Sequence, residues 1–138
     1  MTRQLKSSAK AQKTTWRVTV DVTGPGFTYN VTPTHAPTCD PTYSAPQPNT
    51  GDLHVCAGDK IEWEPNKTDH DIFVIDKDGI LDHDGKRPHG FHGSHGKPGG
   101  GTVDPNGSGR HEYSIVDFDS KTKRVRVKDP VIIIGGGN

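Results

Sequence analysis

The sequence contains few of the residues that fill a large hydrophobic core. Leu, Ile, Val and Phe account for only 26 of the 138 residues. This share, roughly a fifth, is close to that of intrinsically disordered chains. Disordered chains also carry a high net charge, whereas 17 basic side chains balance 17 acidic ones here. The apolar residues are sparse in residues 1–15, 32–52 and 82–109 and dense elsewhere, which predicts one compact domain with polar excursions.

The chain also lacks an excess of charge of either sign and any long apolar run. Nucleic acids and anionic membranes are bound by clusters of Lys and Arg, so we expect neither as a partner. No segment approaches the roughly 20 apolar residues of a membrane-spanning helix. Residues 1–15 are basic but have no apolar stretch typical of a secretion signal. We expect a monomer in the cytoplasm, or in the periplasm or outside the cell if a leader has been removed.

Cysteine is scarce, with only Cys39 and Cys56. Their separation of 17 residues fits neither a CxxC redox motif nor a zinc knuckle. A disulfide across such a loop would add about 3 kcal/mol of stability. Disulfides persist in oxidising compartments, whereas cytosolic thiols are usually reduced. The sequence leaves a disulfide and two free structural thiols equally open.

Alternation of apolar and polar residues, together with two denser apolar runs at 70–75 and 131–134, indicates about eight short strands. The clearest case is WRVTVDV, in which Trp16, Val18 and Val20 share one face. No segment has the apolar period of a helix. The predicted strands are 16–22, 27–31, 53–57, 60–65, 70–75, 110–118, 123–128 and 131–134. In the strand 123–128, we expect Val125 and Val127 to point into the core.

Short strands separated by turn signals are typical of an all-β Greek-key sandwich or barrel, here of about seven to eight strands. We expect a single domain over residues 16–134, between a flexible basic tail at 1–15 and a Gly-rich tail at 135–138. Two long loops interrupt it. Residues 32–52 contain five prolines, which exclude a helix or a central strand. Residues 82–109 are rich in His and Gly.

The second loop carries half of the eight histidines, namely His83, His89, His92 and His95. The last three recur every third residue in HGFHGSHGK, a period that aligns side chains in a polyproline II segment about 9 Å apart. Zinc–nitrogen bonds are only about 2 Å long, so a straight segment cannot bring three imidazoles to one ion. We expect either a mobile loop or a loose Zn, Ni or Cu(II) site to which Asp82 or Asp84 is added.

Two segments resemble the cupredoxin family of Greek-key sandwiches. Residues 55–76, VCAGDKIEWEPNKTDHDIFVID, are similar to the family's GD turn, the strand after it, and a His followed by Asp or Asn, here His70 and Asp71. Residues 107–115, GSGRHEYSI, resemble the strand that leads into the family's copper loop. With the closing DPVIII, the resemblance covers roughly residues 53–134 and implies a β-sandwich scaffold.

The resemblance also implies a copper site of two His, one Cys and a weak axial Met, and most of these ligands are missing. His70 matches the first His, but the Cys position falls at Ile115. No His follows His111, and the only Met is Met1. We therefore expect no type I copper and no electron transfer through it. His70 is then expected either to bind a metal or to pack its ring and bond a backbone carbonyl.

No nucleophile, phosphate-loop or HExxH signature occurs in the sequence, so we do not expect an enzyme. The first hypothesis is a non-enzymatic binding module on a copper-free cupredoxin-like scaffold. It would contact an unidentified protein or small ligand through loops 32–52 and 82–109. The alternative is a metal-handling protein that holds Zn, Ni or Cu loosely through His83, His89, His92 and His95, with His70 as a further candidate ligand. Neither hypothesis includes a tightly bound cofactor.

Overall fold

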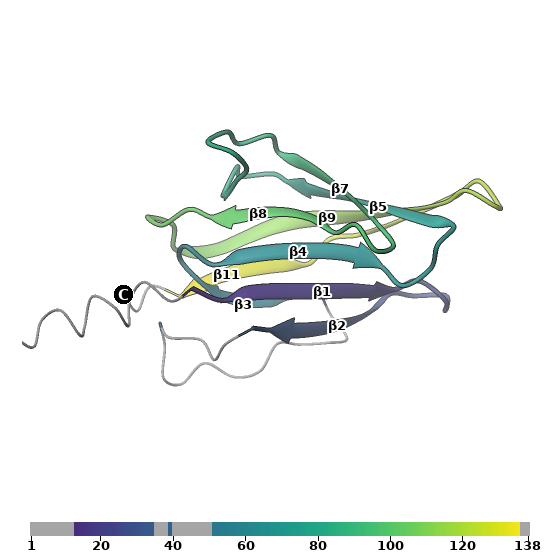
Figure 1. The fold of residues 1–138 in the computed structure, drawn as a ribbon, viewed down its shortest axis with the longest axis horizontal. Coiled ribbons are helices and arrows are strands. Elements are labelled where there is room, and N and C mark those ends of the chain that lie inside the picture. The colour runs from purple at the N-terminus through teal and green to yellow at the C-terminus, as the bar shows by residue number, and fades with distance from the viewer. Residues whose placement is uncertain (1–12, 35–38, 40–50, 136–138) are drawn as a thin grey trace, which may run out of the picture.

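A computed structural model describes residues 13–34, 39 and 51–135. This part of the chain contains eleven strands and no helix, and so no helix that could cross a membrane. The strands form two sheets that enclose one hydrophobic core (Figure 1). The prediction of an all-β sandwich is confirmed.

The first sheet has the strand order β2-β1-β4-β8-β6. In this sheet β1 runs parallel to β4, and the other neighbours are antiparallel. The alternation that predicted β1 is observed, because Trp16, Val18 and Val20 are buried and Arg17 is exposed. The strands of this sheet are β1 (Thr15–Asp21), β2 (Thr28–Pro33), β4 (Lys60–Pro65), β6 (Leu81–Asp82) and β8 (Gly99–Val103).

The second sheet is built around its longest strand, β9. Its order is β3-β11-β9-β5-β7, and β10 also pairs with β9. The first half of β9 pairs with β11 and the second half with β10. The strands of this sheet are β3 (Leu53–Cys56), β5 (His70–Asp76), β7 (Gly90–Ser94), β9 (Gly109–Asp119), β10 (Arg124–Lys128) and β11 (Val131–Gly135).

Aromatic rings join the two sheets inside the core. Trp63 of β4 and Tyr113 of β9 are both buried, and their ring centroids lie 5.5 Å apart. The Tyr113 hydroxyl donates a hydrogen bond to the carbonyl of Gly51. Burial raises the pKa of Tyr113 well above its usual value, so this hydroxyl remains a donor throughout the physiological range.

The His/Gly-rich segment 82–109 is not the flexible or polyproline-like loop predicted from the sequence. β7 pairs with β5 in the second sheet and β8 pairs with β4 in the first, so the segment passes from one sheet to the other. Its glycines allow backbones to approach closely. A Cβ atom on Gly93 would lie 2.3 Å from the carbonyl oxygen of Trp63, and one on Gly100 would lie 1.8 Å from that of Ile61.

The orientation predicted for β10 is also wrong, since Val125 and Val127 are 57% and 54% exposed. The register with β9 explains this result. Val127 pairs with Val116, and Val116 points away from the core because its neighbour Ile115 is fully buried. Phe73 of β5 pairs with Val116 as well and is 42% exposed. The outer face of the second sheet is therefore partly apolar.

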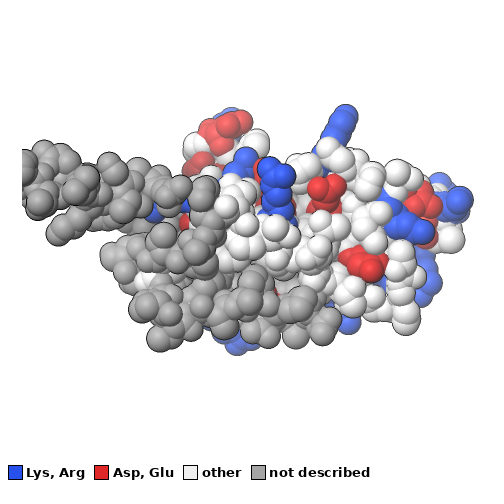
Figure 2. Space-filling view, turned by 60° about the horizontal axis from the view of Figure 1, so that its bottom comes forward, with Lys and Arg blue, Asp and Glu red and all other residues white. Residues whose placement is uncertain are grey.

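Charged side chains of both signs are interspersed over the surface, in keeping with the zero net charge. On the face seen in Figure 2, blue and red side chains, some of them adjacent, are scattered over a largely uncharged surface. Ion pairs on the outer side of the first sheet include Arg17 with Glu62, at 3.8 Å, and Lys60 with Glu62, at 3.1 Å. At the right-hand end of Figure 2, basic side chains gather around acidic ones.

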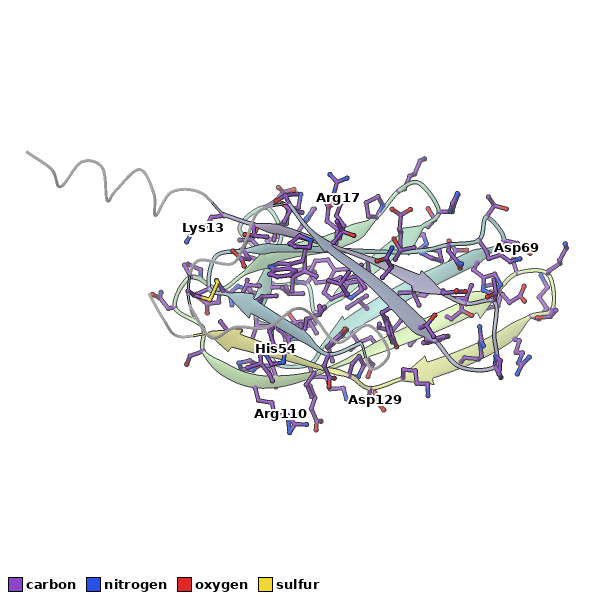
Figure 3. The ribbon with its side chains drawn as sticks, turned by 90° about the horizontal axis from the view of Figure 1, so that it is seen from below. Lys13, Arg17, His54, Asp69, Arg110 and Asp129 are labelled. Carbon is purple, nitrogen blue, oxygen red and sulfur yellow. A yellow bond between two sulfur atoms is a disulfide. The ribbon has the colours of Figure 1, made fainter. Side chains whose placement is uncertain are left out.

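Cys39 and Cys56 form a disulfide, so the alternative of two free thiols is excluded. The bridge lies at the end of the sandwich opposite Asp69 (Figure 3). Most of the Pro-rich stretch 32–52, like most of the predicted tails at 1–15 and 135–138, lies outside the described residues.

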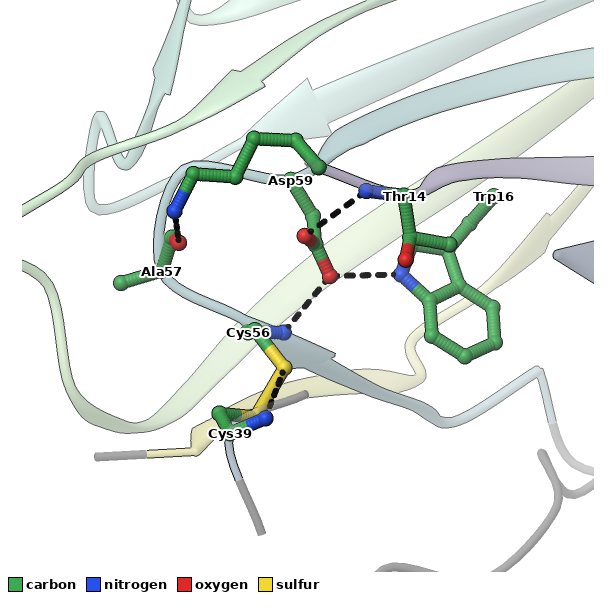
Figure 4. Close-up of a disulfide and its surroundings, with 7 residues drawn as sticks. Thr14, Trp16, Cys39, Cys56, Ala57 and Asp59 are labelled. Atoms are coloured by element: carbon green, nitrogen blue, oxygen red, sulfur yellow. Dashed lines mark hydrogen bonds between the residues drawn. A yellow bond between two sulfur atoms is a disulfide. The ribbon is translucent and has the colours of Figure 1, made fainter. Parts of the chain in front are cut away.

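A buried carboxylate organises the backbone beside the disulfide (Figure 4). Asp59 is 2% exposed. It accepts hydrogen bonds from the indole N–H of Trp16 and the N–H of Cys56, both at 2.9 Å, and from the N–H of Thr14 at 3.3 Å. Asp59 thereby ties the beginning of β1 to the turn between β3 and β4.

Candidate metal centre

One group of potential metal ligands converges at the end of the sandwich opposite the disulfide. Within the described part of the chain, the only group of three or more such side chains whose ligand atoms all lie within 4.8 Å of one another is Asp69, His70 and Asp119. His70 begins β5 and pairs with Asp119 at the end of β9. The strand register thus brings together residues that are far apart in the sequence.

His70 is a buried side chain with a fixed ring. It is 7% exposed, and its Nδ1 lies 2.8 Å and 3.1 Å from the two carboxylate oxygens of Asp117. Asp117 is fully buried and also accepts a hydrogen bond from the Arg126 guanidinium at 3.3 Å. Because the carboxylate accepts the Nδ1 proton, the ring is held in the tautomer that leaves Nε2 available as a metal ligand.

The remaining ring nitrogen faces two further carboxylates. His70 Nε2 lies 3.5 Å from Asp119 Oδ2 and 4.0 Å from Asp69 Oδ1. Both distances exceed the roughly 2.7–3.2 Å of a good hydrogen bond. A tetrahedral ion with bonds of about 2.1 Å separates its ligand atoms by about 3.4 Å. Both distances from His70 Nε2 are therefore closer to the spacing of ligands around a small ion than to that of hydrogen-bonded partners.

Two turns hold the carboxylates in place. The N–H and hydroxyl of Ser120 both donate to the carbonyl of Asp69, at 3.0 and 2.9 Å, which joins the turn before β5 to the turn after β9. The N–H of Lys121 donates to Asp119 Oδ1 at 3.0 Å. Partial burial acts to raise the pKa of Asp119, but hydrogen bonds from Lys121 and Thr122 outweigh it and lower that pKa. Asp119 is therefore a carboxylate at neutral pH.

The three potential ligands line a pocket of about 340 Å³ whose other polar walls are mostly basic. The basic side chains that line it are Lys67, Lys121, Arg124 and Arg126. Lys121 lies 4.0 Å from Asp69, and its side chain is 80% exposed. The pocket therefore combines a cluster of oxygen and nitrogen ligands with a positively charged rim.

The four histidines predicted as loose metal ligands do not converge. All four side chains are exposed, and each ring has its own partner. In chain order, the ring nitrogens contact the carboxylate of Asp84 (His83, 3.4 Å), the carbonyl of Asp76 (His89, 2.8 Å), the carboxylate of Asp71 (His92, 2.8 Å) and the carbonyl of Pro65 (His95, 3.3 Å). Residues three apart in an extended chain point to opposite faces, so the repeat that would align histidines in polyproline II disperses them around β7, which contains only His92.

Of the five candidate metal ligands predicted from the sequence, only His70 lies in the converging group. Its ring bonds a carboxylate instead of the backbone carbonyl considered in the alternative. Ile115 is part of the core and pairs with Val74, and the β9 residue that accepts the hydrogen bond from the His70 ring is Asp117. Asp69, Asp117 and Asp119 were not predicted as site residues. The available signal was the buried-face periodicity of β9, which places position 117 on the same face as Tyr113 and Ile115.

No family model matches this chain, and no curated protein is found to be similar to it. The function must therefore be inferred from the side chains of the site.

Proposed function

We propose that the protein is a non-enzymatic binding protein that holds one divalent metal ion through Asp69, His70 and Asp119. The spacing of these ligand atoms carries the proposal, because His70 Nε2 lies 3.5 and 4.0 Å from the carboxylates. One imidazole and two carboxylates with a fourth position open to a pocket form a donor set that suits Zn²⁺. Zn²⁺ is therefore the first candidate ion.

The charges of the site also support a cation. Two carboxylates neutralise one divalent ion, and the buried Asp117 is already balanced by Arg126 at 3.3 Å. Lys121 competes only weakly for Asp69, since the pair is 4.0 Å apart and the lysine is largely exposed. The alternative is a protonated His70 surrounded by carboxylates, which needs no metal at all.

The scaffold that we propose remains a copper-free, cupredoxin-like sandwich. Both cysteines are joined in the disulfide, which lies at the end opposite Asp69 in Figure 3, so neither offers a thiolate to the site. A disulfide is also typical of oxidising compartments. We therefore place the protein in the periplasm or outside the cell in preference to the cytoplasm.

Calorimetric titration with Zn²⁺ tests the metal site. We expect saturable binding of one ion, and an affinity at least about tenfold weaker in Asp69→Asn and in Asp119→Asn, since even outer-shell changes cost 10–100-fold. Asp71→Asn is the matched control, because Asp71 also lies in β5 but contacts His92 on the surface. This control should bind Zn²⁺ like the wild type.

A second variant separates the two candidate metal sites. Replacing His83, His89, His92 and His95 by Gln removes the four histidines of the His/Gly-rich segment 82–109 and leaves the converging group intact. We expect the high-affinity site to persist in this variant. Loss of binding here, combined with full binding in Asp119→Asn, would reverse the assignment. Zn²⁺ affinity no better than that of a free His peptide in the wild type would favour the protonated His70 and end the proposal.

A further inference from the structure

We propose that the metal centre takes a small oxyanion, the carboxylate or phosphate group of a ligand, as its exogenous ligand. This inference rests on the proposed metal site and names the class of molecule that the site recognises. It depends on two features of the same pocket, namely an incomplete set of protein ligands and a basic rim.

The coordination supplied by the protein is incomplete. Asp69, His70 and Asp119 offer one ligand atom each, whereas Zn²⁺ takes at least four ligands. All three side chains line the pocket of about 340 Å³, so the missing ligand must enter through it. A pocket of this volume lies at the lower end of the range for small-molecule sites.

The charges of the pocket select the sign of that ligand. A divalent ion and the carboxylates of Asp69 and Asp119 sum to zero. Lys67, Lys121 and Arg124 then leave an excess of positive charge on the walls. Lys67 and Arg124 are exposed side chains from two different segments, the turn before β5 and the first position of β10, and both line the pocket.

Arg126 lines the same pocket but serves the scaffold. Its guanidinium donates to the carbonyls of Gly24 and Val22 at 2.5 and 2.7 Å. It also contacts Asp117 and lies 4.9 Å over the ring of Phe27. With three of its five donors occupied in this way, Arg126 fixes the pocket wall, and Lys67, Lys121 and Arg124 provide the further positive charge that attracts a ligand.

Cobalt substitution gives a direct readout of the inner coordination sphere. Co²⁺ is titrated into the wild-type protein, and its visible absorption is recorded while sodium acetate or inorganic phosphate is added in separate arms. We expect a saturable spectral change with at least one of the two anions, because an anion that enters the coordination sphere alters the ligand field. The arm that saturates at lower concentration identifies carboxylate or phosphate as the preferred group.

The variant Lys67→Gln/Arg124→Gln tests the role of the rim. We expect anion affinity about 2- to 30-fold weaker, the combined effect of two exposed charge interactions, with Co²⁺ binding retained. The matched control is Lys86→Gln/Lys97→Gln, which removes two exposed lysines of the His/Gly-rich segment 82–109 that lie outside the pocket. This control should respond to the anions like the wild type.

The outcomes separate this inference from the metal proposal. If Co²⁺ binds to the wild type and not to Asp119→Asn, but neither anion changes the spectrum, the oxyanion inference is wrong and the metal site stands. The oxyanion inference is also wrong if the Lys67→Gln/Arg124→Gln variant binds the anions as tightly as the control. If Co²⁺ does not bind to the wild type, the metal proposal fails and this inference fails with it.

Discussion

A histidine in this protein is defined by the acceptors around its ring. The Nδ1–H of His70 donates a hydrogen bond to Asp117, and the His70 ring lines a pocket, an arrangement that suits a metal ligand. His111 instead has an acceptor at each nitrogen, Asp78 Oδ2 at 2.7 Å and the Ser108 carbonyl at 2.8 Å. A neutral imidazole can donate only one hydrogen bond and an imidazolium can donate two, so the surroundings of His111 favour a proton.

Removal of this ion pair is expected to flatten the pH dependence of stability. Partial burial acts to lower the pKa of His111, but the bonds to Asp78 and Ser108 outweigh it and raise that pKa above 6.5. The pair therefore stabilises the fold fully below about pH 6.5 and loses this effect as pH rises through the higher folded-state pKa. We expect about 0.5 kcal/mol or less, as for other partly exposed pairs.

Urea unfolding between pH 5.5 and 8.5 measures this contribution, about one unit below to two above the usual His pKa. The wild type should lose more stability than His111→Gln as the pH rises across this range. Asp78→Asn keeps the ring and removes the charge, so its profile should resemble that of His111→Gln. Parallel profiles in all three proteins would show that the His111–Asp78 pair does not titrate with folding.

The acidic residues of the site were less predictable from the sequence than His70. His70 stands out in the sequence because it precedes a dense apolar strand, whereas Asp69, Asp117 and Asp119 resemble the many other acidic residues near turns. Their importance depends on the pairing of β5 with β9, which brings Asp119 opposite His70. A register between distant strands is decided by packing of the whole core and cannot be read from either segment alone.

At the scale of elements, local alternation and short apolar runs were sufficient to predict eight of the eleven strands. All eight strands predicted in this way are present, including β1 and β9. β6, β7 and β8 were not predicted, so the described residues contain eleven strands instead of the expected seven to eight. β6 has only two residues, and the Gly-rich β7 and β8 carry no apolar period. The same glycines suggest flexibility in a sequence, while in the fold Gly93 and Gly100 are sites where one backbone lies against another.

This interpretation of the glycines predicts very different losses of stability in two consecutive strands. In Gly100→Ala, the new Cβ atom would lie 1.8 Å from the carbonyl oxygen of Ile61, so β8 must move away from β4. We expect a loss of at least about 2 kcal/mol in the free energy of unfolding. Gly90→Ala in β7 meets no atom within 4 Å and should change stability by no more than about 0.5 kcal/mol.

Thermal and urea unfolding of both variants checks the comparison. If the His/Gly-rich segment 82–109 were a flexible loop, it would tolerate both substitutions equally, since neither alanine would meet a fixed neighbour. Equal stabilities would therefore contradict the pairing of β8 with β4. Loss of stability in Gly100→Ala alone would support it.

At the scale of the whole molecule, the sandwich separates two specialised ends. The disulfide and the Asp59 hydrogen bonds lie at one end, and Asp69 lies at the other (Figure 3). The core between them includes Trp63 and Tyr113. The turns around the site are joined by their own hydrogen bonds, from Ser120 to the carbonyl of Asp69, and need no support from the disulfide.

The double variant Cys39→Ser/Cys56→Ser is therefore expected to lose stability without losing the site. Opening a loop with a sequence separation of 17 residues should lower the free energy of unfolding by about 3 kcal/mol, mainly by freeing the unfolded chain. Urea unfolding measures this loss in the free energy of unfolding. Wild-type protein treated with a reductant should show a loss of the same size. Amide NMR shifts should change around Cys56 and Asp59 and stay constant at Asp69, His70 and Asp119, because each of these three is held by contacts at its own end. Shifts that spread to His70 in the folded variant would instead mean that the two ends are coupled through the core.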